Sequence, residues 1–146
     1  MGIKIIANNK RATYDYFVRE TYEAGLSLRG SEVKGLWAGK AQISQAFVVI
    51  DGSNEAWAHN MGIPHYEFAN RQNHPEMRPR KLLLHKKEIL KIKERCQKED
   101  LTIIVLKVYF KKSYVKMEIA LAKGKKKHDK RQAMREKEGR QKIRDA

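Results

Sequence analysis

Cysteine is almost absent from this sequence, and Cys96 stands alone among 146 residues. A single cysteine excludes a disulfide framework and a cluster of thiolate ligands for a metal. No HExxH pattern or acidic cluster accompanies the five histidines, and the GxxxxGK[ST], GxGxxG and GxSxG motifs are missing as well. We therefore expect no catalytic residue, no metal site and no cofactor. The chain is interpreted as a binding protein, and an enzyme acting on RNA remains a remote alternative.

Long hydrophobic runs are also lacking. No uncharged apolar stretch is long enough to cross a bilayer, and the first ten residues do not contain the apolar centre of a signal peptide. We expect a soluble, cytoplasmic protein with no membrane partner. A length of 146 residues predicts one domain with a real hydrophobic core.

Acidic residues are few, since 17 Asp and Glu face 32 Lys and Arg, which gives a formal net charge of +15. Residues 123–146 hold eleven of the basic and four of the acidic residues, or +7, which leaves +8 on residues 1–122. A basic chain with six Tyr, four Phe and two Trp favours nucleic acid over a membrane as its partner. The aromatic residue that best fits an exposed contact is Trp37, on a short predicted helix.

Residues 123–146 differ from the rest of the chain because they have almost nothing to bury. Their aliphatic or methionine residues are Ala133, Met134, Ile143 and Ala146. Met134 and Ile143 fall on opposite sides of a helix, so no apolar stripe forms, although residues 132–138 are good helix formers. We predict a tail that is disordered in isolation and helical against a polyanion. A merely solubilising tail is the alternative.

Alternation of apolar and polar residues predicts a long strand over residues 14–28, with a bend at Ala24-Gly25 that lets it serve both halves of a curled sheet. A short helix is expected at residues 32–38, capped by Ser31 and ended by Gly39. Strands are predicted at residues 46–50 and 55–60 around a turn. Residues 64–79 show no periodicity and predict a long surface loop.

The pattern becomes helical within residues 80–93. The residues that share one stripe of this predicted helix are Leu82, His85, Ile89, Ile92 and Cys96. Residues 101–110 predict a central strand covered on both faces, and residues 115–122 a strand with one wet face. The count favours a mainly β protein with an OB-like antiparallel β-barrel of about six strands and two or three short helices. This barrel is expected to span residues 1–122.

Three stretches carry long motifs, which read ETYEAGLSLRGSEVK at residues 20–34, RPRKLLLHKKEI at 78–89 and LAKGKKKHDKR at 121–131. Together they resemble the SmpB family, the SsrA-binding proteins of bacterial trans-translation. The resemblance implies an OB-type barrel that binds the tRNA-like domain of tmRNA. It also implies a tail that enters the empty mRNA channel of a stalled ribosome, near the decoding centre, and becomes helical there. Elongation factor Tu and alanyl-tRNA synthetase would be indirect partners through tmRNA.

The resemblance also assigns residues. The implied RNA-binding residues are Glu32, Lys34, Arg80, Lys81, Leu83, His85, Lys86 and Lys87. The implied ribosome-contacting residues of the tail are Gly124, Lys125, Lys126, His128, Asp129, Lys130 and Arg131. The chain departs from some relatives in having His85 where they have asparagine. It also lacks a tryptophan beyond HDKR and carries QNHPEM at residues 72–77.

Each motif alone has a plainer interpretation. Glu32 would suit the first turn of a helix, Leu83 a core, and the lysines after it a solvated face. A ribosomal protein, or a general binder of structured RNA, is the alternative function. The three motifs in the right order over nearly the whole chain favour the tmRNA-binding interpretation.

Overall fold

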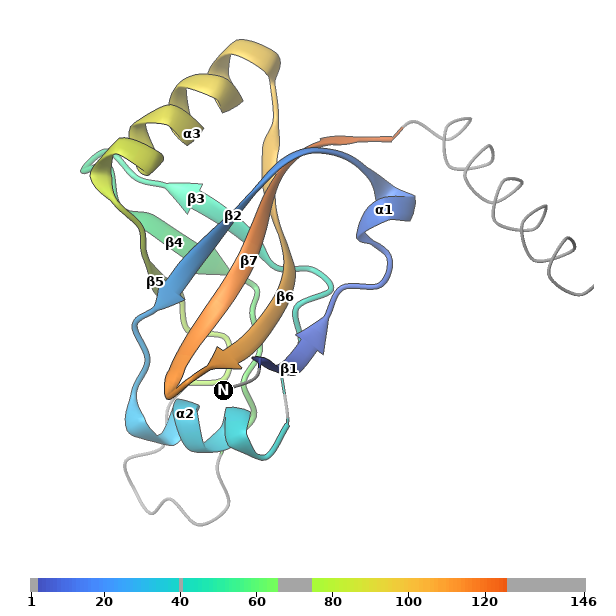
Figure 1. Ribbon diagram of the computed structural model, residues 1–146. Helices are drawn as coiled ribbons and strands as arrows, with labels where there is room; N and C mark the ends of the chain where they lie inside the picture. Colours follow the sequence, from blue (N-terminus) through green and yellow to red (C-terminus); the bar gives the residue numbers. More distant parts are fainter. Residues whose placement is uncertain (1–2, 40, 66–74, 126–146) are drawn as a thin grey trace, which may run out of the picture.

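Seven antiparallel strands form one sheet that curls until it meets itself (Figure 1). The structure is a computed structural model, which describes residues 3–39, 41–65 and 75–125. The strands are β1 (Ile3–Asn8), β2 (Tyr16–Leu26), β3 (Phe47–Ile50), β4 (Ala56–His59), β5 (Arg80–Leu83), β6 (Thr102–Lys111) and β7 (Tyr114–Gly124). The helices are α1 (Ala12–Asp15), α2 (Gly30–Trp37) and α3 (Lys86–Glu99). No helix among these residues is long and apolar enough to cross a membrane.

The strand order is β1-β6-β3-β4-β5-β2-β7, and an additional pairing of β6 with β7 closes the ring. Six strands, β2 to β7, therefore make the barrel, which confirms the predicted OB-like architecture. β1 is a seventh strand that pairs with β6 outside the ring. The prediction from sequence omitted this strand, whose alternate residues Ile3 and Ile5 are exposed.

β2 is shorter than predicted, because Tyr14 and Asp15 belong to α1. Its alternation also breaks at Val18, which is exposed where the pattern predicted an inward side chain. The pairing with β7 shifts register between Val18 and Glu20, and such a bulge moves the following residues to the other face. At Gly25 the strand pairs with both β7 and β5, so it does serve both halves of the barrel.

Two helix boundaries differ from the prediction. α2 begins at Gly30 after Arg29, rather than after a Ser31 cap, and Gly39 follows its end with a φ of 78° as expected. Residues 80–83 form β5 instead of a first helical turn. Leu82 fits the two-residue period of a strand as well as the 3.6-residue period of a helix. The helical pattern therefore wrongly predicted that it belongs to the helix.

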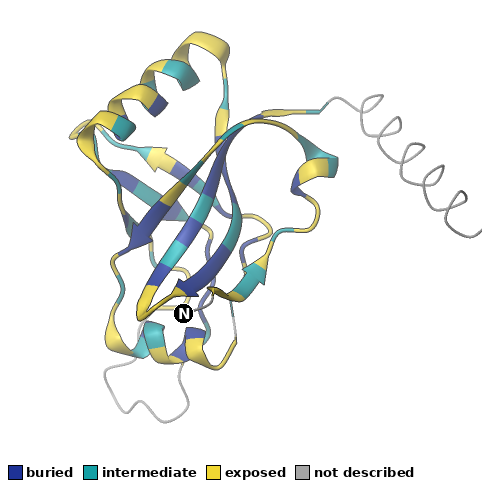
Figure 2. Ribbon diagram, in the orientation of Figure 1, coloured by how far each residue is buried: buried dark blue, intermediate teal, exposed yellow. Residues whose placement is uncertain are grey.

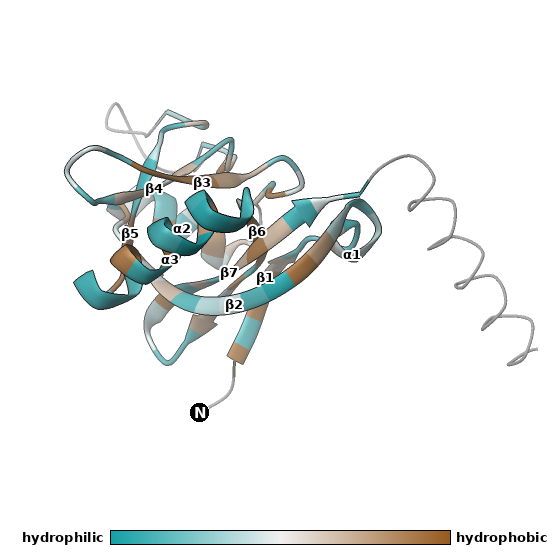
Figure 3. Cartoon of the chain, turned by 90° about the horizontal axis from the view of Figure 1, so that it is seen from above, coloured by the Kyte–Doolittle hydropathy of each residue, from teal (hydrophilic) through white to brown (hydrophobic). Residues whose placement is uncertain are grey.

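α3 confirms three residues of that stripe, whereas His85 precedes the helix and is exposed, so its place on the stripe was wrong. Ile89 and Ile92 are buried against the barrel, and Cys96 is half-buried, where burial raises the pKa of its thiol. Cys96 packs against the core, and a raised pKa leaves less of the nucleophilic thiolate at neutral pH. The remaining surface of α3 is hydrophilic over most of its length (Figure 3).

The core fills the barrel, and its buried residues come from β2 to β7, from α2 and α3, and from the segments flanking β3 and β4 (Figure 2). A second, smaller cluster lies on the outer side of β6 and β7 and consists of Ala12, Ile104, Ala120 and Ala122. Both faces at the start of β6 are therefore covered, as predicted. The expected wet face of β7 holds only for Lys116 and Glu118, because α1 covers the alanines that follow.

β7 continues two residues past the expected end of the body. Lys123 pairs with Phe17 and Gly124 with Tyr16 on β2. Lys125 then donates its backbone N–H to the carbonyl of Asp15 at 2.9 Å and its Nζ to the carbonyl of Thr13 at 2.8 Å. α1 thus holds the base of the tail, and residues 126–146 lie outside the described part of the chain.

This contact predicts where the chain can be cut. A protein ending at Lys125 should keep the melting temperature of the full chain. One ending at Ala122 should lose about 1–3 kcal/mol, because several β2–β7 and α1 hydrogen bonds go with the last three residues. Urea unfolding of the two truncated proteins checks this. Equal stability of both would show that residues 123–125 do not belong to the folded body.

Candidate nucleic-acid interface

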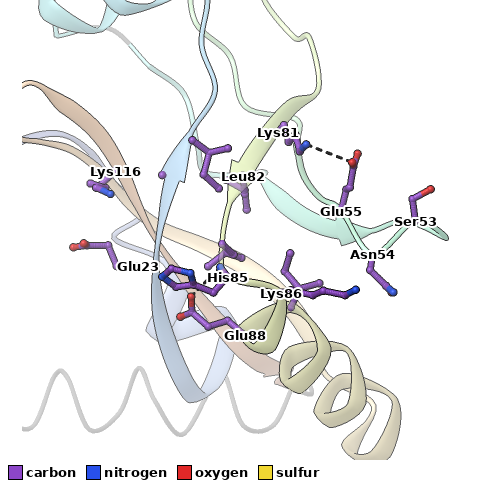
Figure 4. A pocket seen from close by; sticks show the side chains of 14 residues that line it. Glu23, Ser53, Asn54, Glu55, Lys81, Leu82, His85, Lys86, Glu88 and Lys116 are labelled. Atoms are coloured by element: carbon purple, nitrogen blue, oxygen red, sulfur yellow. Dashed lines mark hydrogen bonds and ion pairs between the residues drawn. The ribbon is translucent and has the colours of Figure 1, made fainter.

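An open pocket of about 860 Å³ lies where β2 and β5 meet the start of α3 (Figure 4). It brings together four of the residues that the sequence implicated, and these are Lys81, Leu83, His85 and Lys86. Its wall also includes Lys116 of β7, Ser53 and Asn54 of the turn between β3 and β4, and three carboxylates, which are Glu23, Glu55 and Glu88. The sequence alone does not indicate these residues, because only strand pairing places them beside β5.

The floor of the pocket follows from strand geometry. Side chains alternate along β5, so Arg80 and Leu82 are buried while Lys81 and Leu83 face outward. Leu83 lies beside Gly25, where an added Cβ would stand 3.3 Å from the Leu83 Cβ. The leucine nevertheless keeps 55% of its surface exposed. It is therefore an exposed apolar residue among charged ones, and the interpretation of Leu83 as core is wrong.

His85 stands at the N-terminal boundary of α3, where its backbone N–H donates to the carboxylate of Glu88 at 3.2 Å. Its imidazole is exposed at the rim of the pocket (Figure 4). Lys86 and Lys87 follow in the first helical turn, where positive charge opposes the helix dipole. Glu88 offsets this only in part, so a bound anion would stabilise this end of the helix. These residues suit recognition of a phosphate group.

Glu32 and Arg80 do not lie on this surface, because both side chains are fully buried. Arg80 donates its Nε to Glu32, its Nη1 to the carbonyl of Met61 at 2.5 Å and its Nη2 to that of Glu76 at 3.0 Å. Arg78 donates its Nη2 to the other carboxylate oxygen of Glu32 at 2.5 Å. The sequence alone favoured Glu32 as a surface or helix-start residue and did not reveal this buried network.

The network also fixes the start of α2, since the backbone N–H of Arg29 donates to Glu32 Oε1 at 2.8 Å. Burial raises the pKa of the Glu32 carboxyl, but hydrogen bonds from Arg78, the Arg29 backbone and Arg80 outweigh this effect and leave the pKa below its ordinary value. The carboxylate is therefore charged at neutral pH. It ties α2 to β5, the strand whose outward residues form the floor of the pocket.

The other implicated residues fall in four places. Lys34 is exposed on α2, and Lys87 is exposed on α3 beside the pocket. Gly124 and Lys125 belong to the folded body at the end of β7. Five tail residues lie outside the described part of the chain, and these are Lys126, His128, Asp129, Lys130 and Arg131. The residues that the structure describes contain no group of three or more His, Cys, Asp or Glu that could hold a metal ion.

These features define a small β-barrel protein with a pocket of mixed charge beside its third helix. The chain belongs to the SmpB family, because the family model described as "SmpB protein" matches residues 6–146. The family prediction made from the three motifs is thereby confirmed.

Curated relatives agree over almost the full length. The "SsrA-binding protein" of Pelobacter propionicus is 50% identical over 144 residues, which cover 98% of this chain and 93% of that protein. The "SsrA-binding protein" of Bacillus cereus is 48% identical over 140 residues, with 96% and 90% covered. A solved structure described as "tmRNA-SmpB: a journey to the center of the bacterial ribosome" is 38% identical with a TM-score of 0.69, covering 88% of this chain and 94% of that one.

The buried ion pair makes a prediction about stability. Glu32→Gln should destabilise the fold by about 3–5 kcal/mol, because it leaves the buried Arg80 charge uncompensated. The native Glu32 pKa is depressed, so its contribution is complete above the ordinary carboxyl value of 4.5 and is lost as the pH falls through the lower native value. Urea unfolding between neutral and acidic pH measures both effects.

Asp15→Asn is the matched control, since that carboxylate is on the surface helix α1, and it should cost far less. If Glu32→Gln unfolds outright, the double change Glu32→Leu with Arg80→Met should recover part of the stability, because it removes both buried charges together. A Glu32→Gln protein as stable as the wild type would contradict the role given to the pair.

Proposed function

We propose that this protein binds tmRNA and acts in trans-translation, delivering tmRNA to stalled ribosomes. The observation that carries the proposal is the near full-length identity of about one half to proteins named for binding SsrA, the tmRNA. The solved relative, whose description joins tmRNA, SmpB and the ribosome, supports the same partners. The barrel supplies no catalytic group in this proposal, and its contribution is recognition.

The pocket beside α3 is the proposed contact with the tRNA-like domain. Structured RNA is recognised by its shape, its phosphates and sugars, and by bases that are free of stacking. Lys81, Lys86 and Lys116 line it together with the exposed Leu83, so cations for phosphates stand near an apolar surface for a base or sugar. The carboxylates of Glu23, Glu55 and Glu88 line it as well, and Glu55 pairs with Lys81 at 3.4 Å. His85 adds a ring at the rim that can stack or donate a hydrogen bond. Lys87 extends the basic surface along α3.

Glu32 and Arg80 contribute indirectly in this proposal. They hold β5 against α2 from inside the barrel, so that Lys81 and Leu83 keep their positions on the outside. Loss of Glu32 should therefore weaken tmRNA binding even though it raises the net positive charge. Lys34, exposed on α2, is proposed to meet RNA away from the pocket.

The tail is the proposed sensor of the ribosome. Its charge of about +7 suits the mRNA channel, a cavity lined with RNA phosphates, and it has no apolar stripe to commit to the barrel. α1 fixes the point from which the tail starts, through the contacts of Lys125 with Thr13 and Asp15. We propose that the tail becomes helical in the channel near the decoding centre. Elongation factor Tu and alanyl-tRNA synthetase would then be indirect partners in the cytoplasm.

The experiment that tests this function is to identify the RNA that co-purifies with the protein from its own host. One dominant RNA that can be charged with alanine is expected. A stoichiometric presence of the protein on all ribosomes, without such an RNA, would instead favour a ribosomal protein.

The basic surplus of residues 1–122 predicts a steep salt dependence of tmRNA binding. If the body neutralises about five phosphates, the slope of log K against log salt should be roughly −3.5 to −4.5. Lys86→Gln should make the slope shallower by about 0.7–0.9, because one phosphate contact is lost. Filter binding over a salt series gives these slopes, and a flat profile would contradict electrostatic recognition by this surface.

Two tail variants test whether tagging depends on the order of the tail residues or only on their net charge. The triple change Asp129→Ala, Lys130→Ala, Arg131→Ala removes only one unit of net positive charge, yet tagging of nascent chains on stalled ribosomes should collapse. A protein in which residues 126–146 are scrambled keeps the full charge and the Lys125 anchor, and it should fail as well. Both should bind tmRNA nearly normally. A scrambled tail that supports tagging would show that the tail acts only through its charge.

A further inference from the structure

Trp37 ends α2 in an unusual position for so large an apolar residue, because 51% of its surface is exposed. One face of its indole stacks on the ring of Phe110, with the centroids 4.1 Å apart and the planes inclined by 18°. Phe110 belongs to β6 and is itself almost fully buried. The indole therefore covers the buried Phe110 ring, while about half of its own surface stays accessible and the Lys4 ammonium lies over the ring.

This arrangement is that of a rigid stacking platform. The ring rests on a buried aromatic side chain of the central strand, and α2 is held by the Glu32 network at its other end. A flat ring that is already fixed in place loses little conformational entropy when a second ring stacks on it. Proteins that bind single-stranded nucleic acid use such rings, because every base has a π-face.

The charge around Trp37 indicates what would stack there. The Nζ of Lys4 lies 5.1 Å from the centroid of the indole, and Lys34 is exposed one turn earlier on α2. The acidic residue of α2, Glu32, is buried and bound by arginines. A cation beside an exposed ring is held weakly. Lys4 can therefore turn to a phosphate when a base takes its place, and the surroundings favour an anionic ligand with a planar ring.

We propose that the exposed face of Trp37 is a stacking site for an unpaired RNA base, with Lys4 binding the adjacent phosphate. The site is separate from the pocket, because α2 and α3 lie toward opposite ends of the barrel (Figure 1). It would contact a different segment of RNA from the one at Leu83 and His85. The proposal rests on the proposed function only in taking RNA as the partner.

The two tryptophans allow a direct test. Trp57→Phe leaves Trp37 as the only tryptophan, and Trp37→Phe leaves Trp57, whose Nε1–H donates to Asp51 at 2.9 Å. A short oligouridylate should quench the fluorescence of the Trp57→Phe protein. A ribose-phosphate oligomer of equal length without bases should not, and the Trp37→Phe protein should respond to neither.

Affinity provides the second measurement. Trp37→Leu keeps an apolar cover over Phe110 but removes the π-face, and it should weaken oligouridylate binding on the order of tenfold. Tyr114→Leu removes another exposed ring, on the β6–β7 hairpin, and should change binding less than twofold. Lys4→Gln should reduce the salt slope of oligouridylate binding by about 0.7, since one phosphate contact is lost.

Equal quenching by the oligomer without bases, or equal losses in Trp37→Leu and Tyr114→Leu, would overturn the proposal. So would a Trp37→Leu protein that melts earlier but binds oligouridylate normally, because Trp37 would then be only a lid on the core. Binding of the tmRNA tRNA-like domain is measured with the same proteins. If oligouridylate does not quench Trp37 in the Trp57→Phe protein while that protein still binds the tRNA-like domain, the Trp37 site alone is refuted. If the wild type does not bind the tRNA-like domain, the proposed function is refuted.

Discussion

The carboxylate of Glu32 and the guanidinium of Arg80 form an ion pair inside the barrel, and much of the molecule is arranged around it. Arg80 also binds the carbonyls of Met61 and Glu76, and Glu32 binds Arg78 and the first turn of α2. Two charges out of water are stable only when every donor and acceptor is engaged, and a pair of this kind strongly penalises any displacement of its partners. It therefore fixes one helix, one short strand and two connections relative to one another.

The same network decides what faces outward. Because Arg80 points into the barrel, the alternation of β5 turns Lys81 and Leu83 to the surface. The pocket exists because these residues, the start of α3 and the turn after β3 meet where the sheet closes.

Acidic and basic residues are also used differently in this protein. Several carboxylates in the body are used to join elements, as when Glu20 pairs with Arg95 of α3 and Glu23 with Tyr109 and Lys111 of β6. The hydrogen bond from Tyr109 holds the pKa of Glu23 below its ordinary value, so this carboxylate stays charged. Acidic groups thus stabilise the fold, and the surplus of lysine and arginine is left for a polyanionic partner.

The sequence by itself determined the class of fold, most of the long strands and the family. Hydrophobic periodicity is a local property, and in β6, β7 and α3 it matched the burial that the barrel imposes. Three features needed the tertiary structure, namely β1, the bulge in β2 and the strand at residues 80–83. In each, the side that a residue faces depends on a partner strand rather than on its neighbours in sequence. The burial of Glu32 is the feature that is hardest to predict from the sequence, since a glutamate in the first turn of a helix is normally on the surface. Only the approach of Arg78 and Arg80, more than forty residues away in the chain, makes its burial possible.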